Sequence, residues 1–229
     1  MKKKPLKHIA FILDGNKRWA KKNNIKILDG YKGGIENIYK IVSYIYNNNI
    51  EFLTLYLLST ENINRKNNIS FFSLAKKSFN DFVNRIDQIG NIKINIIGEK
   101  DNLPNDIKKM IGTFDSENKK KSKLTINLAF NYGFDSELKS VIENVISYSS
   151  KNKININDVK IDDFFYIGNQ PDPDILIRTG GYKRLSNFIL KNLTYTEIYF
   201  LEILWPELKT NHIDKIIKNY RKIKRNYGL

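Results

Sequence analysis

The stretch HIAFILDGNKRW, residues 8–19, decides the expected fold of this chain. Its first half, residues 8–13, is an apolar run of about the length of a strand buried on both faces, as the strands of parallel sheets are. The polarity then changes within one residue, because Asp14 is followed by Gly, Asn, Lys and Arg at positions 15–18. Ligands of parallel α/β proteins bind at the carboxyl ends of the strands. The stretch therefore predicts a strand that leads directly into a ligand-binding turn.

The turn after this strand has the chemistry of a site for a phosphorylated ligand. Backbone N–H groups at the start of a following helix bind phosphate oxygens, and Arg18 can bind them in a bidentate manner. Asp14 would repel such an anion unless a divalent cation lay between them, and Mg²⁺ is commonly held by one carboxylate together with substrate phosphates. The alternative is that Asp14 caps a helix beside a solvated basic turn, since Asp-Gly-Asn is also ordinary turn sequence. The residues alone leave both interpretations open.

Composition limits the class of protein. With 229 residues, of which 41% are hydrophobic, the chain can build a sizeable core. It has no cysteine and two histidines, which excludes disulfides and thiolate metal sites, argues against zinc and fits the reducing cytoplasm. One histidine, His8, is expected to pack or hydrogen-bond locally at the start of its strand. No apolar run approaches the roughly 18 residues of a membrane-spanning helix.

The formal charge of +15 is weak evidence of function. Such a charge attracts nucleic acid, anionic membrane surfaces or phosphorylated substrates. Lys, Asn and Ile are abundant throughout the chain, however, which indicates that an AT-rich coding bias contributes much of the charge. A nucleic-acid-binding module would be favoured only by this charge and by the tyrosines, and we expect no nucleic-acid partner.

Hydrophobic periodicity predicts alternating strands and helices along the chain. Strands are expected at 52–58, 92–97, 124–130 and finally 175–177, in addition to the opening strand. Helices are expected at 35–46, 70–89, shortly after Pro104, at 138–148 and at 158–166, with an exposed charged turn at 117–123. This alternation predicts one α/β domain over residues 1–229, with a mostly parallel central sheet flanked by helices on both faces and a flexible basic N-terminus at 1–7.

Polar clusters follow the predicted strands, at the edge where a site would form. They lie at 59–65 (STENINR), 131–133 (NYG) and 178–187 (RTGGYKRLSN). Arg18, Arg65, Arg178 and Arg184 are thereby placed to converge on one rim. Four arginines exceed the need of one metal-bound diphosphate, so two anionic substrates are expected. The absence of GxxxxGK[ST] and GxGxxG patterns argues against nucleoside triphosphates and dinucleotides.

Five blocks of the sequence, taken in order, resemble the signature blocks of the cis-prenyltransferases, of which the bacterial undecaprenyl diphosphate synthases are examples. The blocks are 8–19, 55–62 with Arg65, 127–133, 173–188 and 195–206. The resemblance implies a homodimeric, Mg²⁺-dependent α/β enzyme. It would condense isopentenyl diphosphate with an allylic diphosphate, such as farnesyl diphosphate, to form Z double bonds.

The resemblance also assigns roles to residues. It implies that Asp14 and Asn62 are catalytic, that Asp14 and Glu197 bind the metal, and that Glu197 reaches the site of the neighbouring subunit. A neutral amide such as that of Asn62 is a poor base, so diphosphate or water is the alternative proton acceptor. The expected substrate-binding residues, most of which lie in the matching blocks, are Gly15, Asn16, Lys17, Arg18, Trp19, Tyr31, Ser59, Thr60, Glu61, Arg65, Arg178, Arg184, Leu185 and Ser186.

Several residues depart from the usual pattern of the family. Losing an Arg and a His near the diphosphate, at Ile27 and Tyr31, should weaken anion binding, although Lys17 adds a flexible positive charge and Tyr31 can donate one hydrogen bond. Tyr182 replaces a common Glu. The remaining departures are Ile63, Phe134, Asp135, Lys191 and Asn192. These changes permit a short-chain or a branched or cyclic product instead of a long linear one. A noncatalytic partner subunit is a further alternative.

The resemblance implies that an apolar tunnel between the strand at 52–58 and the helix at 70–89 sets product length. Leu57 stands where long-chain members often carry Ala, and a bulkier side chain in a close-packed tunnel stops elongation earlier. Smaller neighbours could instead compensate for Leu57. The basic residues 215–225 of the last expected helix form either a solvated face or a surface for anionic lipid that aids product release, which would place the protein in the cytoplasm, peripherally at the inner face of the membrane.

Overall fold

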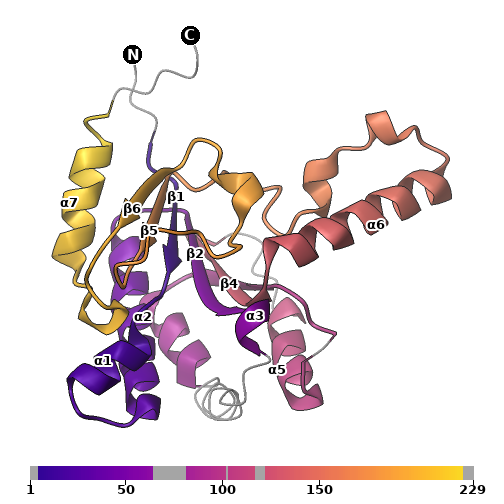
Figure 1. The fold of residues 1–229 in the computed structure, drawn as a ribbon. Helices are drawn as coiled ribbons and strands as arrows, with labels where there is room; N and C mark the ends of the chain where they lie inside the picture. Colours follow the sequence, from indigo (N-terminus) through magenta and orange to yellow (C-terminus); the bar gives the residue numbers. More distant parts are fainter. Residues whose placement is uncertain (1–4, 64–80, 102, 117–121, 224–229) are drawn as a thin grey trace.

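A six-stranded, entirely parallel sheet forms the centre of the molecule (Figure 1). The computed structural model describes residues 5–63, 81–101, 103–116 and 122–223. The strand order is β3-β4-β2-β1-β5-β6, so the strand of the opening stretch lies inside the sheet. The strands are β1 (His8–Ile12), β2 (Phe52–Ser59), β3 (Ile92–Ile97), β4 (Leu124–Tyr132), β5 (Ile175–Arg178) and β6 (Glu197–Phe200).

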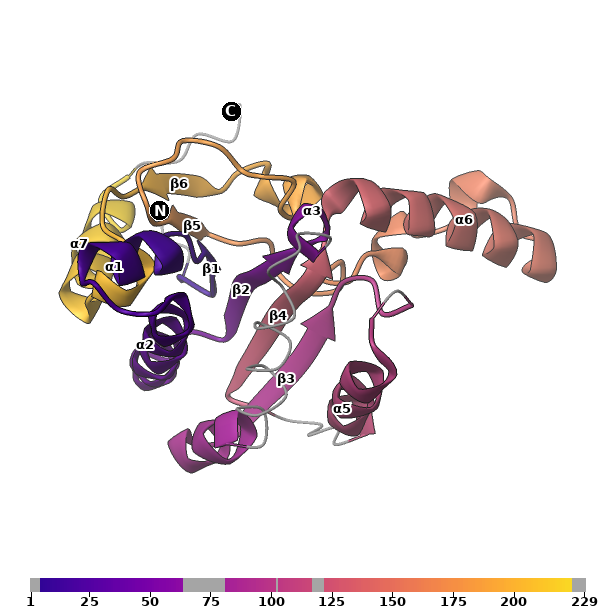
Figure 2. The same ribbon diagram turned by 60° about the horizontal axis from the view of Figure 1, so that its bottom comes forward.

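Helices cover both faces of this sheet. One face packs against α2 (Ile27–Asn47), α7 (Thr210–Tyr220), the helix at 81–89 and α5 (Asn105–Ser116), and the other is covered by the segment 185–193, which contains a 3₁₀ turn. Figure 2 shows α6 (Phe134–Asn152) extending away from the sheet. The short elements are α1 (Asn16–Lys22), α3 (Thr60–Ile63) and the 3₁₀ turns η1 (Ile156–Asp158), η2 (Ile161–Phe164), η3 (Leu190–Leu193) and η4 (Trp205–Glu207).

The apolar run of β1 is buried because it has a core on each side. Ile9 and Phe11 belong to the larger cluster beneath α2 and α7, whereas Ala10 and Ile12 belong to the cluster on the opposite face. All five residues of the strand are buried. A continuous apolar run, rather than alternation, is what a central parallel strand requires. The expectation for this strand is therefore confirmed.

The other expected strands are confirmed, with some corrections to the pattern. The strand at 175–177 is not the last, because β6 follows it and pairs with β5. The expected helix at 158–166 is wrong, since the structure has the two 3₁₀ turns η1 and η2 there. The helix expected from residue 35 begins at Ile27. A Cβ at Gly30 would lie 2.6 Å from the carbonyl oxygen of Asn16, so glycine here allows α1 and α2 to approach closely.

Parts of three expectations lie outside the described residues. The first is residues 70–80 of the long helix expected at 70–89, whose remainder is helical at 81–89. The others are residues 117–121 of the charged turn and residues 1–4 of the basic N-terminus. The backbone of Lys7 is anchored, since its N–H donates to Asp174 Oδ2 at 2.7 Å. Among the helices of the described part of the chain, none is long and apolar enough to cross a membrane.

Candidate active site

A cavity of about 780 Å³ opens at the carboxyl edge of the sheet, where β1, β2 and β5 end. Its walls come from the last residues of those strands and the segments after them, with one contribution from α2. The lining residues are Ile12, Leu13, Asp14, Gly15, Asn16, Lys17, Arg18, Tyr31, Tyr56, Leu57, Leu58, Ser59, Glu61, Asn62, Arg178, Tyr182, Arg184, Ser186 and Asn187. The convergence of Arg18, Arg178 and Arg184 expected from the strand-end pattern is confirmed, while Arg65 lies outside the described residues.

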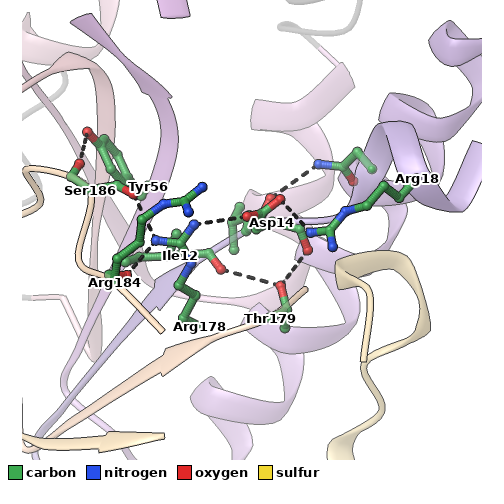
Figure 3. Close-up of polar contacts among 10 residues, drawn as sticks. Ile12, Asp14, Arg18, Tyr56, Arg178, Thr179, Arg184 and Ser186 are labelled. Carbon is green, nitrogen blue, oxygen red and sulfur yellow. Dashed lines mark hydrogen bonds and ion pairs between the residues drawn. The ribbon is translucent and has the colours of Figure 1, made fainter. Parts of the chain in front are cut away.

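Asp14 is held between two arginines (Figure 3). One carboxylate oxygen accepts from Arg18 Nη2 at 3.1 Å and the other from Arg178 Nη2 at 3.0 Å. Its backbone carbonyl accepts from Thr179 Oγ1 at 2.8 Å, which ties the end of β1 to the end of β5. The N-cap of α1 is Gly15, with no side-chain cap hydrogen bond. The alternative that Asp14 caps the following helix is therefore wrong.

Arg178 is the buried centre of the site. Its side chain is 3% exposed, and besides Asp14 its guanidinium donates to Ser186 Oγ at 2.8 Å and to the carbonyl oxygen of Arg184 at 2.5 Å. Its Nε is buried without a partner among the described residues. Ser186 has a φ of 52°, a left-handed backbone conformation that non-glycine residues adopt uncommonly. The loop after β5 is thus folded around one guanidinium.

The opening turn is as tight as its sequence indicates. Gly15 has a φ of 121°, and a Cβ there would lie 2.9 Å from Leu204 Cα. Asn16 begins α1, and its buried Oδ1 has no partner among the described residues. Lys17 is exposed at the cavity. Trp19 does not line the cavity; a Cβ at Gly33 would lie 2.9 Å from its ring, so it packs between α1 and α2.

The segment after β2 supplies the opposite wall. Ser59 Oγ accepts from the backbone N–H of Asn62 at 3.2 Å, and Asn187 Nδ2 donates to Glu61 Oε1 at 3.1 Å. Burial alone would raise the pKa of Glu61, but hydrogen bonds from its own backbone, Ser59, Thr60 and Asn187 outweigh burial and lower it. Glu61 is therefore held as a carboxylate. Thr60 begins α3 and does not line the cavity.

Tyr31 and Leu185 differ in their relation to the cavity. Tyr31, from the second turn of α2, lines it. Leu185 lies outside its lining and packs against the apolar cluster that contains Ile12 and Phe188. Tyr31 is thus placed to contact a ligand, whereas Leu185 supports the loop from behind.

Sequence reasoning assigned no role to three residues that build the site. The Tyr56 hydroxyl donates to the carbonyls of Tyr132 and Ser186, both at 3.1 Å, and its ring stacks on Phe188 with centroids 4.4 Å apart. Thr179 joins β1 to β5, as described above, and Tyr182 lies beside the arginines. The signal in the sequence for Tyr56 was an aromatic hydroxyl near the carboxyl end of a largely apolar strand.

Glu197 is not brought to this cavity within one chain. It is the first residue of β6 and pairs with Ile175, whereas Arg178 pairs with Phe200. Because the strands are parallel, Glu197 lies at the amino end of the sheet, the end opposite to Asp14. No cluster of three or more His, Cys, Asp or Glu side chains that could hold a metal ion occurs among the residues that the structure describes.

The charges of the cavity are suited to an anionic ligand. Arg18, Arg178, Arg184 and Lys17 line the cavity, against the two carboxylates of Asp14 and Glu61. Guanidinium groups bind phosphate oxygens in a fixed fork, and the carboxyl edge of a parallel sheet is where such ligands lie. The fold and the site therefore define an α/β protein for phosphorylated ligands.

Comparison with known proteins identifies the class more closely. The family model described as "Putative undecaprenyl diphosphate synthase" matches residues 12–228. The isoprenyl transferase of Fusobacterium nucleatum is 36% identical over 100% of this chain and 98% of the relative. The geranylgeranyl-diphosphate-specific tritrans,polycis-undecaprenyl-diphosphate synthase of Thermococcus kodakarensis is 34% identical over 97% of this chain and 86% of the relative.

A solved structure agrees with these matches. Lavandulyl diphosphate synthase from Lavandula x intermedia, in complex with dimethylallyl diphosphate, has a TM-score of 0.88 and 25% identity over 97% of this chain and 98% of its own. The chain belongs to the cis-prenyltransferase family, and it is a prenyl-transferring enzyme whose relatives are isoprenyl transferases and undecaprenyl diphosphate synthases. The resemblance drawn from the five sequence blocks is confirmed.

Proposed function

We propose that this enzyme uses Mg²⁺ to condense isopentenyl diphosphate with an allylic diphosphate such as farnesyl diphosphate, giving a Z-prenyl diphosphate. The observation that carries the proposal is the position of Asp14 between Arg18 and Arg178 in the cavity. Breaking an allylic C–O bond places negative charge on the departing diphosphate. A site that has cations fixed beforehand stabilises that charge as it forms.

The donor set fits a magnesium ion. The Asp14 side chain is 28% exposed and lines the cavity, so it can accept a cation that arrives with a substrate. Mg²⁺ is commonly held by one or two carboxylates plus substrate phosphates rather than by a cage of protein ligands. Bound there, the ion would add positive charge beside the leaving diphosphate.

The side chains of the cavity divide between two diphosphates. Arg18 and the turn at Gly15–Asn16, with Lys17 and Tyr31 beside them, would bind the allylic diphosphate. Arg184 and Ser186, held by Arg178, would bind isopentenyl diphosphate. Ser59, Glu61 and Asn62 would orient the substrates from the wall after β2. The amide of Asn62 would position rather than remove the proton, with the diphosphate or a water as acceptor.

The product of the proposed reaction has three candidates. Leu57 lines the cavity from β2, so its volume would limit chain growth and favour a product shorter than undecaprenyl. An undecaprenyl-type product would follow if the surrounding residues leave room. The structural likeness to lavandulyl diphosphate synthase favours a third candidate, a branched short product.

The enzyme would act as a homodimer. β6 is an edge strand, with Ile198 37% and Phe200 36% exposed, and nearby Tyr195 is 64% exposed. An apolar sheet edge of this kind is suited to burial against a second copy. Glu197 on the same strand would then serve the partner's site, consistent with its distance from Asp14 within one chain.

Product release would occur at an anionic membrane surface. The buried face of α7, which includes Ile213, Ile216 and Ile217, packs on the core, while Lys215 and Lys218 face outward. Basic side chains near a surface are drawn to anionic lipid. The enzyme would thus be cytoplasmic and contact the membrane transiently.

The test is product analysis with the purified chain alone. Labelled isopentenyl diphosphate is incubated with Mg²⁺ and, in separate arms, dimethylallyl, farnesyl or geranylgeranyl diphosphate, and the dephosphorylated products are sized. A ladder of Z-prenyl products supports elongation, and a single branched C10 product supports the third candidate. No turnover in any arm would instead indicate a noncatalytic partner subunit and refute the proposal.

A further inference from the structure

Tyr182 lies among the three arginines of the cavity. Its ring centroid is 4.2 Å from Arg184 Cζ, 4.7 Å from Arg18 Cζ and 5.8 Å from Arg178 Cζ. All three distances fall within the range of about 6 Å over which the face of an aromatic ring attracts a cation. The ring is 43% exposed and lines the cavity, so it lies at the mouth of the site rather than in the core.

The backbone next to Tyr182 is fixed. Gly180 and Gly181 have φ values of 86° and 79°, and their N–H groups donate to the carbonyls of Ile203 and Leu201, both at 2.8 Å. Both positive φ values disfavour any residue with a side chain, and a Cβ at Gly180 would also lie 3.1 Å from the carbonyl oxygen of Asp14. This turn therefore presents the ring from a rigid support, which is the condition for orienting other groups.

Arg184 depends on this ring more than the other two arginines do. Arg18 and Arg178 both form ion pairs with Asp14. Within the described part of the chain the Arg184 guanidinium forms no ion pair, and its contact is with the ring. Three cations that lie around one ring repel one another. A neutral ring that attracts each of them offsets part of that repulsion without adding a carboxylate.

The kind of group that holds the Arg184 guanidinium determines how readily a phosphate can bind to it. A carboxylate would occupy the N–H donors of Arg184 and would have to be displaced before a phosphate could bind them. A ring contacts the face of the guanidinium and leaves its five in-plane N–H donors available. The cation would thus be held in place and remain ready for an anion, a preorganisation that improves affinity.

We propose that Tyr182 is a positioning residue that holds Arg184, and to a lesser degree Arg18, ready for diphosphate through the face of its ring. The inference rests on the proposed function for the identity of the substrates. Because Arg184 is the nearest cation, loss of the ring affects isopentenyl diphosphate more than the allylic diphosphate. The hydroxyl of Tyr182 is not required.

The experiment compares Tyr182→Leu with Tyr182→Phe in the full chain. Steady-state kinetics are measured for both substrates, and binding of inorganic pyrophosphate is measured by calorimetry. Tyr148→Leu is the matched control, since Tyr148 is 45% exposed on α6 and meets Phe164 edge-on, away from the cavity. Thermal unfolding of each variant verifies that it is folded.

Tyr182→Leu is expected to raise the KM of isopentenyl diphosphate roughly three- to tenfold, with kcat within about twofold and a similar weakening of pyrophosphate binding. Tyr182→Phe and Tyr148→Leu should stay within about twofold of the parent. The inference is overturned if Tyr182→Leu binds pyrophosphate as the parent does, or if Tyr182→Phe is as impaired as Tyr182→Leu. If the parent and the variants show this pattern of pyrophosphate binding but the parent makes no prenyl product, the proposed function is refuted and the role of the ring still holds.

Discussion

Replacing Arg178 by Lys tests whether the shape of the buried cation, rather than its charge, organises the site. The guanidinium serves three acceptors, at 3.0 Å on Asp14, 2.8 Å on Ser186 and 2.5 Å on the carbonyl of Arg184, and its side chain is 3% exposed. An ammonium group keeps the charge but lacks the planar fork that spans such acceptors. We expect Arg178→Lys to keep the pair with Asp14 and to lose the bonds that fold the loop.

The expected loss of stability in Arg178→Lys follows from these contacts. Hydrogen bonds to a charged group contribute about 1.5–3 kcal/mol each, and the loss of two is partly offset because water can enter the cavity beside the 28% exposed Asp14. The variant should therefore lose about 2–3 kcal/mol of unfolding free energy. For a chain of this size that corresponds to a fall in Tm of roughly 5–10 °C.

Arg85→Lys is the matched control. Arg85 forms a bidentate pair with Glu36, but the two side chains are 34% and 54% exposed, and such surface pairs contribute at most about 1 kcal/mol. Urea unfolding and thermal melts of both variants are the assay, with kcat/KM for isopentenyl diphosphate as the functional readout, expected to fall roughly 100-fold in Arg178→Lys only. Equal stability and activity of the two variants would refute the reasoning.

Three further predictions follow from the same structure. Gly15→Ala should lower Tm and reduce turnover at least roughly tenfold, because φ is 121° and the new Cβ would lie 2.9 Å from Leu204 Cα; a variant with parental melting and turnover would contradict this. Burial lowers the pKa of His8 to about 4, against about 6.5 in the unfolded chain. The contribution of neutral His8 to the unfolding free energy is therefore complete above pH 6.5 and falls by up to about 3 kcal/mol as the pH drops towards 4. Urea unfolding at both pH values should show this loss of stability in the parent but not in His8→Gln, and an equal loss in both would disprove the assignment. Leu57→Ala should shift the products, sized by chromatography, to longer chains, and an unchanged distribution would refute the volume argument.

Strands with two buried faces were predictable, because each appears as an apolar run. β6 was missed, because its apolar run at 198–201 is only four residues long and the strand lies at the edge of the sheet, with Ile198 and Phe200 exposed. The start of α2 was also missed, because its glycines weaken a helical pattern. A Cβ at position 34 would lie 2.3 Å from Asn16 Oδ1, so the close packing of α2 on α1 requires Gly34 despite the low helix propensity of glycine.

The site was predictable in outline because strand ends collect at one edge of a parallel sheet. That rule brought Asp14, Arg18, Arg178 and Arg184 together without any structure. It could not assign Thr179 or Tyr182 a role, since hydrogen bonds to Asp14 and contacts with guanidiniums depend on how distant loops pack. Nor could it place Glu197, because β6 had not been recognised as a strand.

The most direct test of the central claim is prenyl transfer measured with and without divalent metal, using the parent protein and Asp14→Ala. The account predicts that labelled isopentenyl diphosphate enters product only with Mg²⁺ and the intact carboxylate, and that EDTA or the substitution lowers turnover at least roughly 1,000-fold. Calorimetry with pyrophosphate in the absence of metal should show that Asp14→Ala still binds the anion, since its arginines remain. Equal turnover without metal, or in Asp14→Ala, would contradict the account.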